Sequence, residues 1–436
     1  MWALIFMRAC IIKKVSMNIR FIARASIAAF GTYFCMYAFR KPFTVATFAD
    51  ESFWGIDYKI LLIIAQVVGY TLSKFIGIKV ISEMKSGKRM LALVGFILFA
   101  EVSLLGFAIT PAPYNILFLF LNGLPLGMVW GIVFSYLEGR KATELLGVIL
   151  SSSFIVSSGA VKSVGKIVLD SFEFNEYWMP FITGLFFIIP LIFFAWLLEK
   201  LPKPTEEDTR LKVVRKPLDS AGRKKLFKEF SGPLILIVFF FMLLTALRDF
   251  RDNFAREIWD SLGYKDASIY SISEIPIAII VLIILGVIGS ISKNYKAFVY
   301  YHYVLFVSCL AVIISTYLFQ YNEISALTWM IISGLGLYSC YVPFNGIFFD
   351  RMIATFKING NVGFLIYIAD AFGYFGSILI LLYKNFGKGD ISWLSFFTYA
   401  LYILAFIGVL ITLYSFYFFK AKKNKEQKIN QLVYES

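Results

Sequence analysis

The sequence predicts an all-α integral membrane protein whose roughly twelve transmembrane helices form two pseudo-symmetric six-helix bundles. Composition is the first observation. The 436 residues are 59% hydrophobic and 16% charged, whereas soluble domains have about 45–50% apolar and about 25% charged residues. The second observation is about twelve stretches that each reach the roughly 20 apolar residues needed to cross a bilayer. The third is a single long polar loop, Lys200 to Ser231, which divides these stretches into two groups of six.

Taken in order, the expected spans are 21–40, 58–82, 89–110, 113–137, 145–169, 177–199, 232–250, 267–292, 295–319, 323–349, 361–384 and 391–419. The corresponding domains are an N-terminal segment 1–20, a first bundle 21–199, a linker 200–231, a second bundle 232–419 and a basic tail 420–436. Met17 is a candidate for the true start, because Asn18-Ile19-Arg20 leads directly into the first span.

Lysine and arginine are distributed unevenly between the loops. With both termini and the linker inside, roughly 29 of the 42 Lys and Arg fall in cytoplasmic segments and roughly 8 in outer loops. We therefore expect a multi-pass protein of the inner (plasma) membrane with cytoplasmic N- and C-termini.

The net charge of +14 follows these loops, so it does not indicate nucleic-acid binding. His302 is the one histidine, and the cysteines stand far apart with no zinc or disulfide spacing. A membrane enzyme would need a histidine or a clustered nucleophile at the bilayer surface. We expect no cofactor, no metal site and no enzymatic activity. The four cysteines with this spacing are Cys10, Cys35, Cys309 and Cys340.

The expected partners are the lipid bilayer and a small anionic solute, bound by a monomer.

Ionisable residues within a bilayer are costly, so each is a candidate for function. Arg40 ends the first span, and Tyr33, Tyr37 and Arg40 follow i, i+4, i+7 spacing, which puts them on one helix face. A guanidinium stays charged and matches phosphate or carboxylate oxygens in pairs. This face is a candidate substrate-binding surface.

Two lysines extend the list of candidate substrate ligands. Lys74 lies near the inner end of the second span, where it either extends toward the headgroups or reaches a central cavity. Lys162 lies deep in the fifth span among small residues that permit close helix approach, so it needs an anion or a carboxylate as partner.

The second half brings its own arginines, Arg248 and Arg251, at the end of the seventh span beside Asp249 and Asp252. Phe39 to Phe43 and Phe250 to Phe254 share an F-R-x-x-F frame, which pairs Arg40 with Arg251. We expect each half to bring an arginine to one central site. Whether Arg248 or Arg251 is the second arginine stays open.

Two intramembrane acids are candidates for coupling or gating. Asp370 is about midway along the eleventh span and shares a face with Tyr374, a further candidate ligand, and Ser377. Such a carboxylate must pair with a base or carry a proton. Glu274 precedes Pro276 in the eighth span and is similar.

The two-times-six plan is that of the major facilitator superfamily, in which two halves rock about a midplane site. Within it, Tyr37-Ala38-Phe39-Arg40-Lys41-Pro42-Phe43 resembles the Y-x-x-R-K-x-F run in helix 1 of the organophosphate:phosphate antiporters. Ser73-Lys74-Phe75-Ile76-Gly77 is similar to their helix 2 block. Ala371-Phe372-Gly373-Tyr374-Phe375-Gly376 is similar to their helix 11 F-G-Y-x-G, and Leu247-Arg248 falls near their helix 7 arginine.

The resemblance implies that Arg40 and Arg248 bind a phosphate and that Lys74 lines its path. Two departures weaken a sugar-phosphate specificity. The family's helix 5 histidine would fall near Val156, where no histidine stands. The loop from Gly77 to Arg89 has Glu and Lys where the superfamily usually has Asp and Arg.

These observations predict a secondary active transporter of a small organic anion, with phosphate or a phosphorylated metabolite as the leading substrate and rocker-switch alternating access as the mechanism. One alternative is a ligand-sensing membrane receptor of the same fold. Another is a transporter of the same superfamily for a peptide, a muropeptide or another non-phosphate solute.

Overall fold

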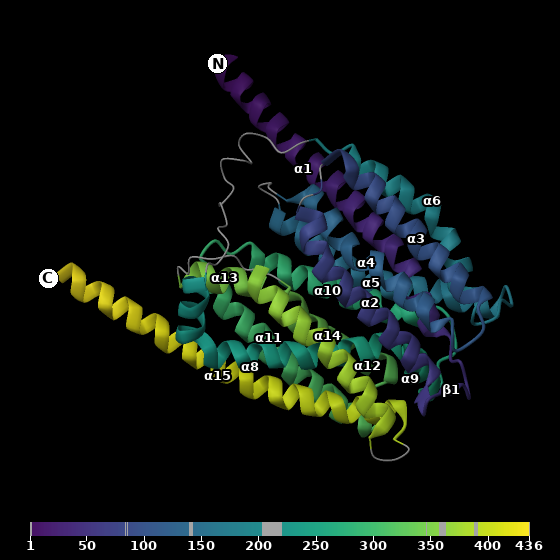
Figure 1. Ribbon diagram of the computed structural model, residues 1–436. Coiled ribbons are helices and arrows are strands. Elements are labelled where there is room, and N and C mark those ends of the chain that lie inside the picture. Colours follow the sequence, from purple (N-terminus) through teal and green to yellow (C-terminus); the bar gives the residue numbers. More distant parts are fainter. Residues whose placement is uncertain are drawn as a thin grey trace. The chain divides into compact units, whose positions relative to one another are not determined.

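The computed structural model describes residues 2–82, 84, 86–138, 143–202, 220–345, 347–356, 363–387 and 391–435. It is almost entirely helical, as predicted (Figure 1). Among these residues, eleven helices are long and apolar enough to cross a membrane, and their ends agree with the predicted spans to within about five residues, except that the last runs to Lys428 and not to 419. The helix at the position of the remaining predicted span, α14, is Gly363–Phe386 and is not among the eleven. The all-α membrane fold is therefore confirmed.

The helices of the first half run from α1 to α6. They are α1 (Trp2–Met36), η1 (Tyr37–Phe39), η2 (Pro42–Val45), α2 (Tyr58–Ser82), η3 (Ser86–Lys88), α3 (Arg89–Ile109), α4 (Ile116–Leu137), α5 (Thr143–Asp170) and α6 (Met179–Glu199). Those of the second half are α8 (Ser220–Asn253), α9 (Ala255–Ser261), α10 (Ile269–Gly289), α11 (Asn294–Gln320), α12 (Ala326–Phe344), α13 (Ile347–Thr355), α14 (Gly363–Phe386) and α15 (Trp393–Glu435). α8 begins at Ser220, inside the stretch predicted as a linker.

The chain forms two compact units. The first comprises Met1–Phe43 and Leu61–Val213, and the second comprises Thr44–Ile60 and Val214–Ser436. The predicted boundaries place Thr44–Ile60 in the first bundle, but this segment packs with the second unit.

A small hairpin that the sequence analysis did not predict lies in this segment. β1 (Ser52–Phe53) pairs antiparallel with β2 (Ile56–Asp57). Its two-residue turn places Trp54 and Gly55 at φ angles of 55° and 74°. Two successive positive φ angles match the twist of paired strands, which is why short hairpins favour glycine in the turn.

Several helices begin at a residue whose side chain accepts an orphan backbone N–H. Asp57 Oδ1 accepts the N–H of Ile60 at the start of α2, and Ser325 Oγ accepts that of Thr328 at the start of α12. Ser392 Oγ accepts the N–H of the third residue of α15 in the same way. Short polar residues just before each apolar run therefore set where these helices start.

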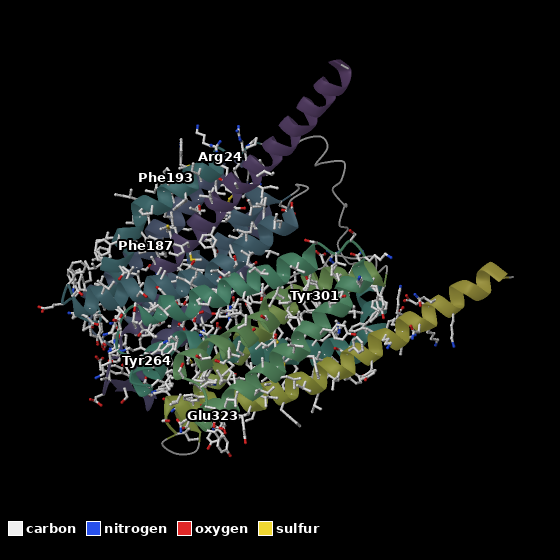
Figure 2. The ribbon with its side chains drawn as sticks, turned by 180° about the vertical axis from the view of Figure 1, so that it is seen from behind. Arg24, Phe187, Phe193, Tyr264, Tyr301 and Glu323 are labelled. Carbon is white, nitrogen blue, oxygen red and sulfur yellow. The ribbon has the colours of Figure 1, made fainter. Side chains whose placement is uncertain are left out.

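Burial distinguishes inner from peripheral helices. The most apolar window of α12 is 72% buried, whereas that of α6 is 28% buried. Phe193 points outward from α6, and Arg24 lies exposed on α1 (Figure 2). The exposed apolar side chains of α6 are those of a helix that faces lipid.

Candidate functional site

Arg40 stands where the first helix changes form. α1 ends at Met36, and the chain tightens into the 3₁₀ turn η1, whose C-cap is Arg40. The guanidinium carbon lies 3.9 Å from the centre of the Tyr70 ring and 6.0 Å from that of Tyr37. Tyr33 packs edge to face on Tyr37 with ring centres 5.6 Å apart, so the predicted aromatic face exists. The nearest aromatic surface to Arg40 nevertheless comes from α2.

Tyr70 also joins Arg40 to Lys74. The Lys74 ammonium lies 5.6 Å from the centre of the same ring, one helical turn along α2. Tyr70 was not among the predicted site residues. The available signal was the i, i+4 spacing of Tyr70 and Lys74 on one helix face. We call Arg40, Tyr70 and Lys74 the first-unit cation cluster.

Lys162 is buried in α5, with 4% of its surface exposed, beside the buried Ser158 and Ser163. Lys166, one turn later, is paired with Asp170 Oδ1 at 2.5 Å. Both α5 lysines are thus buried, since Lys166 is 6% exposed.

The second unit also sets an arginine over a tyrosine. The guanidinium carbon of Arg248 lies 4.0 Å from the ring centre of Tyr341, on α12. Its Nη2 lies 2.5 Å from Asp249 Oδ1, and Ser377 Oγ donates to Asp249 Oδ2 at 2.8 Å. Arg248, Asp249 and Ser377 therefore form a continuous polar chain from α8 to α14.

Arg251 is held differently. Its Nη1 lies 2.5 Å from Glu274 Oε1 on α10, and its Nη2 donates to the Met330 carbonyl on α12 at 3.2 Å. The side chain of Arg251 is 3% exposed, whereas that of Arg248 is 14% exposed. Arg251 joins three helices of one unit, and Glu274 is its ion-pair partner.

Asp370 and Tyr374 lie on α14, where Asp370 is partly exposed and Tyr374 is buried. The helix approaches α8 closely at two glycines of the same block. A Cβ at Gly373 would lie 2.9 Å from Thr245 Oγ1, and one at Gly376 would lie 2.5 Å from Met242 Cγ. The F-G-Y-x-G block therefore packs α14 against α8.

Glu101 received no role in the sequence analysis. It lies on α3, is 4% exposed, and neither carboxyl oxygen has a hydrogen-bond partner within the described ranges. A Cβ at Gly184 of α6 would lie 2.1 Å from its Oε2, so the glycine leaves room for the carboxyl group.

Cys309 and Cys340 are 31 residues apart, yet their Sγ atoms are 4.0 Å apart between α11 and α12. The sequence spacing gave no sign of this. Both thiols are buried.

The segment Thr44–Ile60 carries a buried ion pair within the second unit. Lys59, 1% exposed, pairs with Glu257 of α9 and donates to the Thr44 carbonyl at 2.8 Å. Burial raises the pKa of Glu257, although Lys59 opposes the rise. Asn385 of α14 accepts the Asp57 N–H and donates to the Gly55 carbonyl, which fixes the hairpin.

Comparison with solved structures identifies the fold. The nucleoside transporter NupG matches with 16% identity and a TM-score of 0.59, covering 92% of this chain and 99% of that one. The tetrameric PepTSo2 matches with 13% identity and a TM-score of 0.62, covering 92% and 98%. The inward-open xylose transporter XylE from E. coli matches with 12% identity and a TM-score of 0.57, covering 91% and 95%.

The fold is thus that of the major facilitator superfamily. None of these three structures is an organophosphate:phosphate antiporter, so the narrower resemblance gains no support from them. No curated protein matches the chain. A protein family does match, over residues 42–422. The chain therefore belongs to the family of unknown function DUF5690.

Proposed function

We propose that the protein is a secondary transporter of a small organic anion that works by alternating access, with phosphate or a phosphorylated metabolite as the leading substrate. The observation that carries the proposal is the first-unit cation cluster, in which Arg40 lies over the Tyr70 ring at the broken end of the first helix. Two basic side chains, Arg40 and Lys74, meet at that one ring.

The geometry of this cluster suits an oxyanion. A cation over an aromatic face is worth about 0.5–2 kcal/mol, the larger value where water is excluded. The N–H groups of a guanidinium lie in its plane, and their spacing matches paired oxygens of a phosphate or carboxylate. Lys74 adds a second positive charge, which raises the local concentration of anions.

In the second unit the contacts favour Arg248 over Arg251 as a ligand. Both terminal nitrogens of Arg251 are engaged, by Glu274 and by the Met330 carbonyl. Arg248 shares with Arg40 the position over a tyrosine. The same proposal includes Lys162 and Tyr374 as further ligands and Asp370 and Glu274 as coupling residues. It also includes a location in the inner membrane with both termini in the cytoplasm.

The test is exchange of radiolabelled phosphate by proteoliposomes containing the purified protein. Arg40→Lys should abolish the exchange, because lysine keeps the charge but lacks the planar fork. Arg24→Lys makes the same change at an exposed position of α1 and should leave the exchange intact. Full exchange by the Arg40→Lys variant would refute anion binding by this cluster.

A second candidate is a zwitterionic solute such as a peptide. The polar chain of Arg248, Asp249 and Ser377 offers a cation and a carboxylate together. A thermal-shift screen against phosphate, sugar phosphates, peptides and muropeptides separates the two candidates, since a ligand raises apparent stability by mass action. Stabilisation by peptides and not by phosphates would favour the zwitterionic solute.

A further inference from the structure

The end of the first helix leaves backbone carbonyls that the helix itself does not satisfy. After Met36 the 3₁₀ turn η1 closes with the N–H groups of Arg40 and Lys41 both donating to the Tyr37 carbonyl. Pro42 follows and has no N–H, so the helical ladder cannot continue through it. A carbonyl left without a donor at membrane depth costs several kcal/mol. The turn that carries Arg40 therefore requires donors from elsewhere.

Two buried amide side chains supply these donors. Asn122 of α4 donates to the Phe39 carbonyl at 2.9 Å and to the Ala100 carbonyl at 3.1 Å. Gln66 of α2 donates to the Arg40 carbonyl at 3.0 Å and to Asn122 Oδ1 at 2.8 Å. Asn122 is 0% exposed and Gln66 is 4% exposed. The four bonds link the broken turn to three neighbouring helices.

Glycines bring α2 and α4 close enough for this network. A Cβ at Gly123 would lie 2.3 Å from the Gln66 carbonyl oxygen, and one at Gly69 would lie 2.2 Å from that of Phe120. At Gly127 it would lie 2.6 Å from the Tyr70 carbonyl oxygen. Gly123 and Gly127 follow the small-xxx-small spacing that allows two membrane helices to approach. The same close contact therefore sets both the amide network and the ring beneath Arg40.

We propose that Gln66 and Asn122 are positioning residues of the anion site: they hold the 3₁₀ turn so that the Arg40 guanidinium stays over Tyr70. The inference rests on the proposed function for its consequence in binding, while the fixing of the turn itself is a property of the free protein. Both amides donate to carbonyls of the turn, so they act on Arg40 through its backbone.

The first experiment measures the turn in the absence of any solute. Hydrogen–deuterium exchange of the peptide containing Tyr37 to Lys41 is compared in the wild-type protein, Gln66→Met and Asn122→Leu. Each variant keeps the volume and removes the donors, so exchange in this peptide should quicken by about tenfold. Asn115→Leu is the matched control. It removes another fully buried amide of the α4 region, which donates to the Phe107 carbonyl, without touching the turn.

The second experiment measures the dissociation constant for inorganic phosphate. Gln66→Met and Asn122→Leu should raise it by about tenfold, while Asn115→Leu leaves it unchanged. If Asn122→Leu fails to fold, Gln66→Asn replaces it, because the shorter side chain keeps a buried amide but cannot reach both partners.

The outcomes separate this inference from the proposed function. Wild-type exchange in the Tyr37–Lys41 peptide of both variants would overturn the inference, whatever the protein transports. Loss of phosphate binding in Arg40→Lys with wild-type affinity in both variants would also overturn the inference and leave the proposed function standing. Faster exchange of the turn in a protein that does not bind phosphate would support the positioning role and refute the phosphate site.

Discussion

Replacing Arg251 by methionine tests whether its buried ion pair is structural. The side chain bridges Glu274 at 2.5 Å and the Met330 carbonyl at 3.2 Å, and the arginine is 3% exposed. In the Arg251→Met variant, the carboxylate of Glu274, whose side chain is 12% exposed, loses this countercharge. Breaking a buried pair on one side costs about 3–5 kcal/mol, whereas replacing both partners with apolar residues is close to neutral.

The expected change in apparent melting temperature follows from that free energy. For a folding unit of 150–250 residues, each kcal/mol shifts the midpoint by about 2–4 °C, so Arg251→Met should lower it by roughly 6–20 °C. The assay is thermal unfolding of the purified protein in detergent, followed by tryptophan fluorescence. The double variant Arg251→Met with Glu274→Leu should recover most of the loss. Arg256→Met is the control, because the pair of Arg256 and Asp260 is partly exposed and worth less than about 1 kcal/mol.

Two results would contradict this reasoning. The first is a shift in Arg251→Met no larger than that in Arg256→Met. The second is a double variant as unstable as the single one. Phosphate affinity adds an independent reading: a stable double variant that no longer binds phosphate would make Arg251, and not Arg248, the second arginine of the site.

Three further predictions concern packing, pH and the ring beneath Arg40. Gly123→Ala should destabilise the protein by about 1–3 kcal/mol in thermal unfolding, because its Cβ would meet a backbone carbonyl at 2.3 Å, whereas Gly95→Ala, with open space around it, should be neutral or slightly stabilising. Burial raises the pKa of Glu257, so its carboxyl group holds a proton to higher pH in the folded protein than in the unfolded one. Apparent stability should therefore fall as the pH rises through the folded-state pKa of Glu257. The Glu257→Gln variant should show a weaker dependence of stability on pH. Tyr70→Leu should weaken phosphate binding by about 2–30-fold and Tyr70→Phe by little, measured by equilibrium dialysis, because phenylalanine keeps the aromatic face.

The membrane fold was predictable because its signal is local. Each span needs only its own run of apolar residues, and no run depends on its neighbours to be recognised. The hairpin at 52–57 was missed because its strands are two residues long and lack an alternating pattern. The grouping of Thr44–Ile60 with the second unit was missed because Lys59 and Glu257 lie 198 residues apart.

The candidate site was predictable only in part, for a physical reason. Which residues are costly in a bilayer can be read from the sequence, so Arg40, Lys74 and Arg248 could be named as candidates. What each one contacts depends on helix rotation and spacing. Tyr70 lies under Arg40 and Tyr341 under Arg248 because other helices bring them there. The sequence contains no local pattern that reports these contacts.

The two arginine positions of the second unit illustrate this limit. The F-R-x-x-F frame makes Arg251 the equivalent of Arg40. The surroundings make Arg248 the equivalent, since Arg40 and Arg248 each lie about 4 Å from a tyrosine ring centre. Arg251 is one helical turn further along α8, where Glu274 of α10 comes within reach. A shared frame compares the order of residues along one helix, whereas the role of an arginine depends on whether the facing helix offers an aromatic ring or a carboxylate. Both arginines also have a carboxylate partner, Asp249 for Arg248 and Glu274 for Arg251. What separates them is the tyrosine ring beneath Arg248 and the Met330 carbonyl that Arg251 also reaches. We therefore propose Arg248 as the second arginine of the anion site on the strength of the ring beneath it, which the frame along α8 does not report.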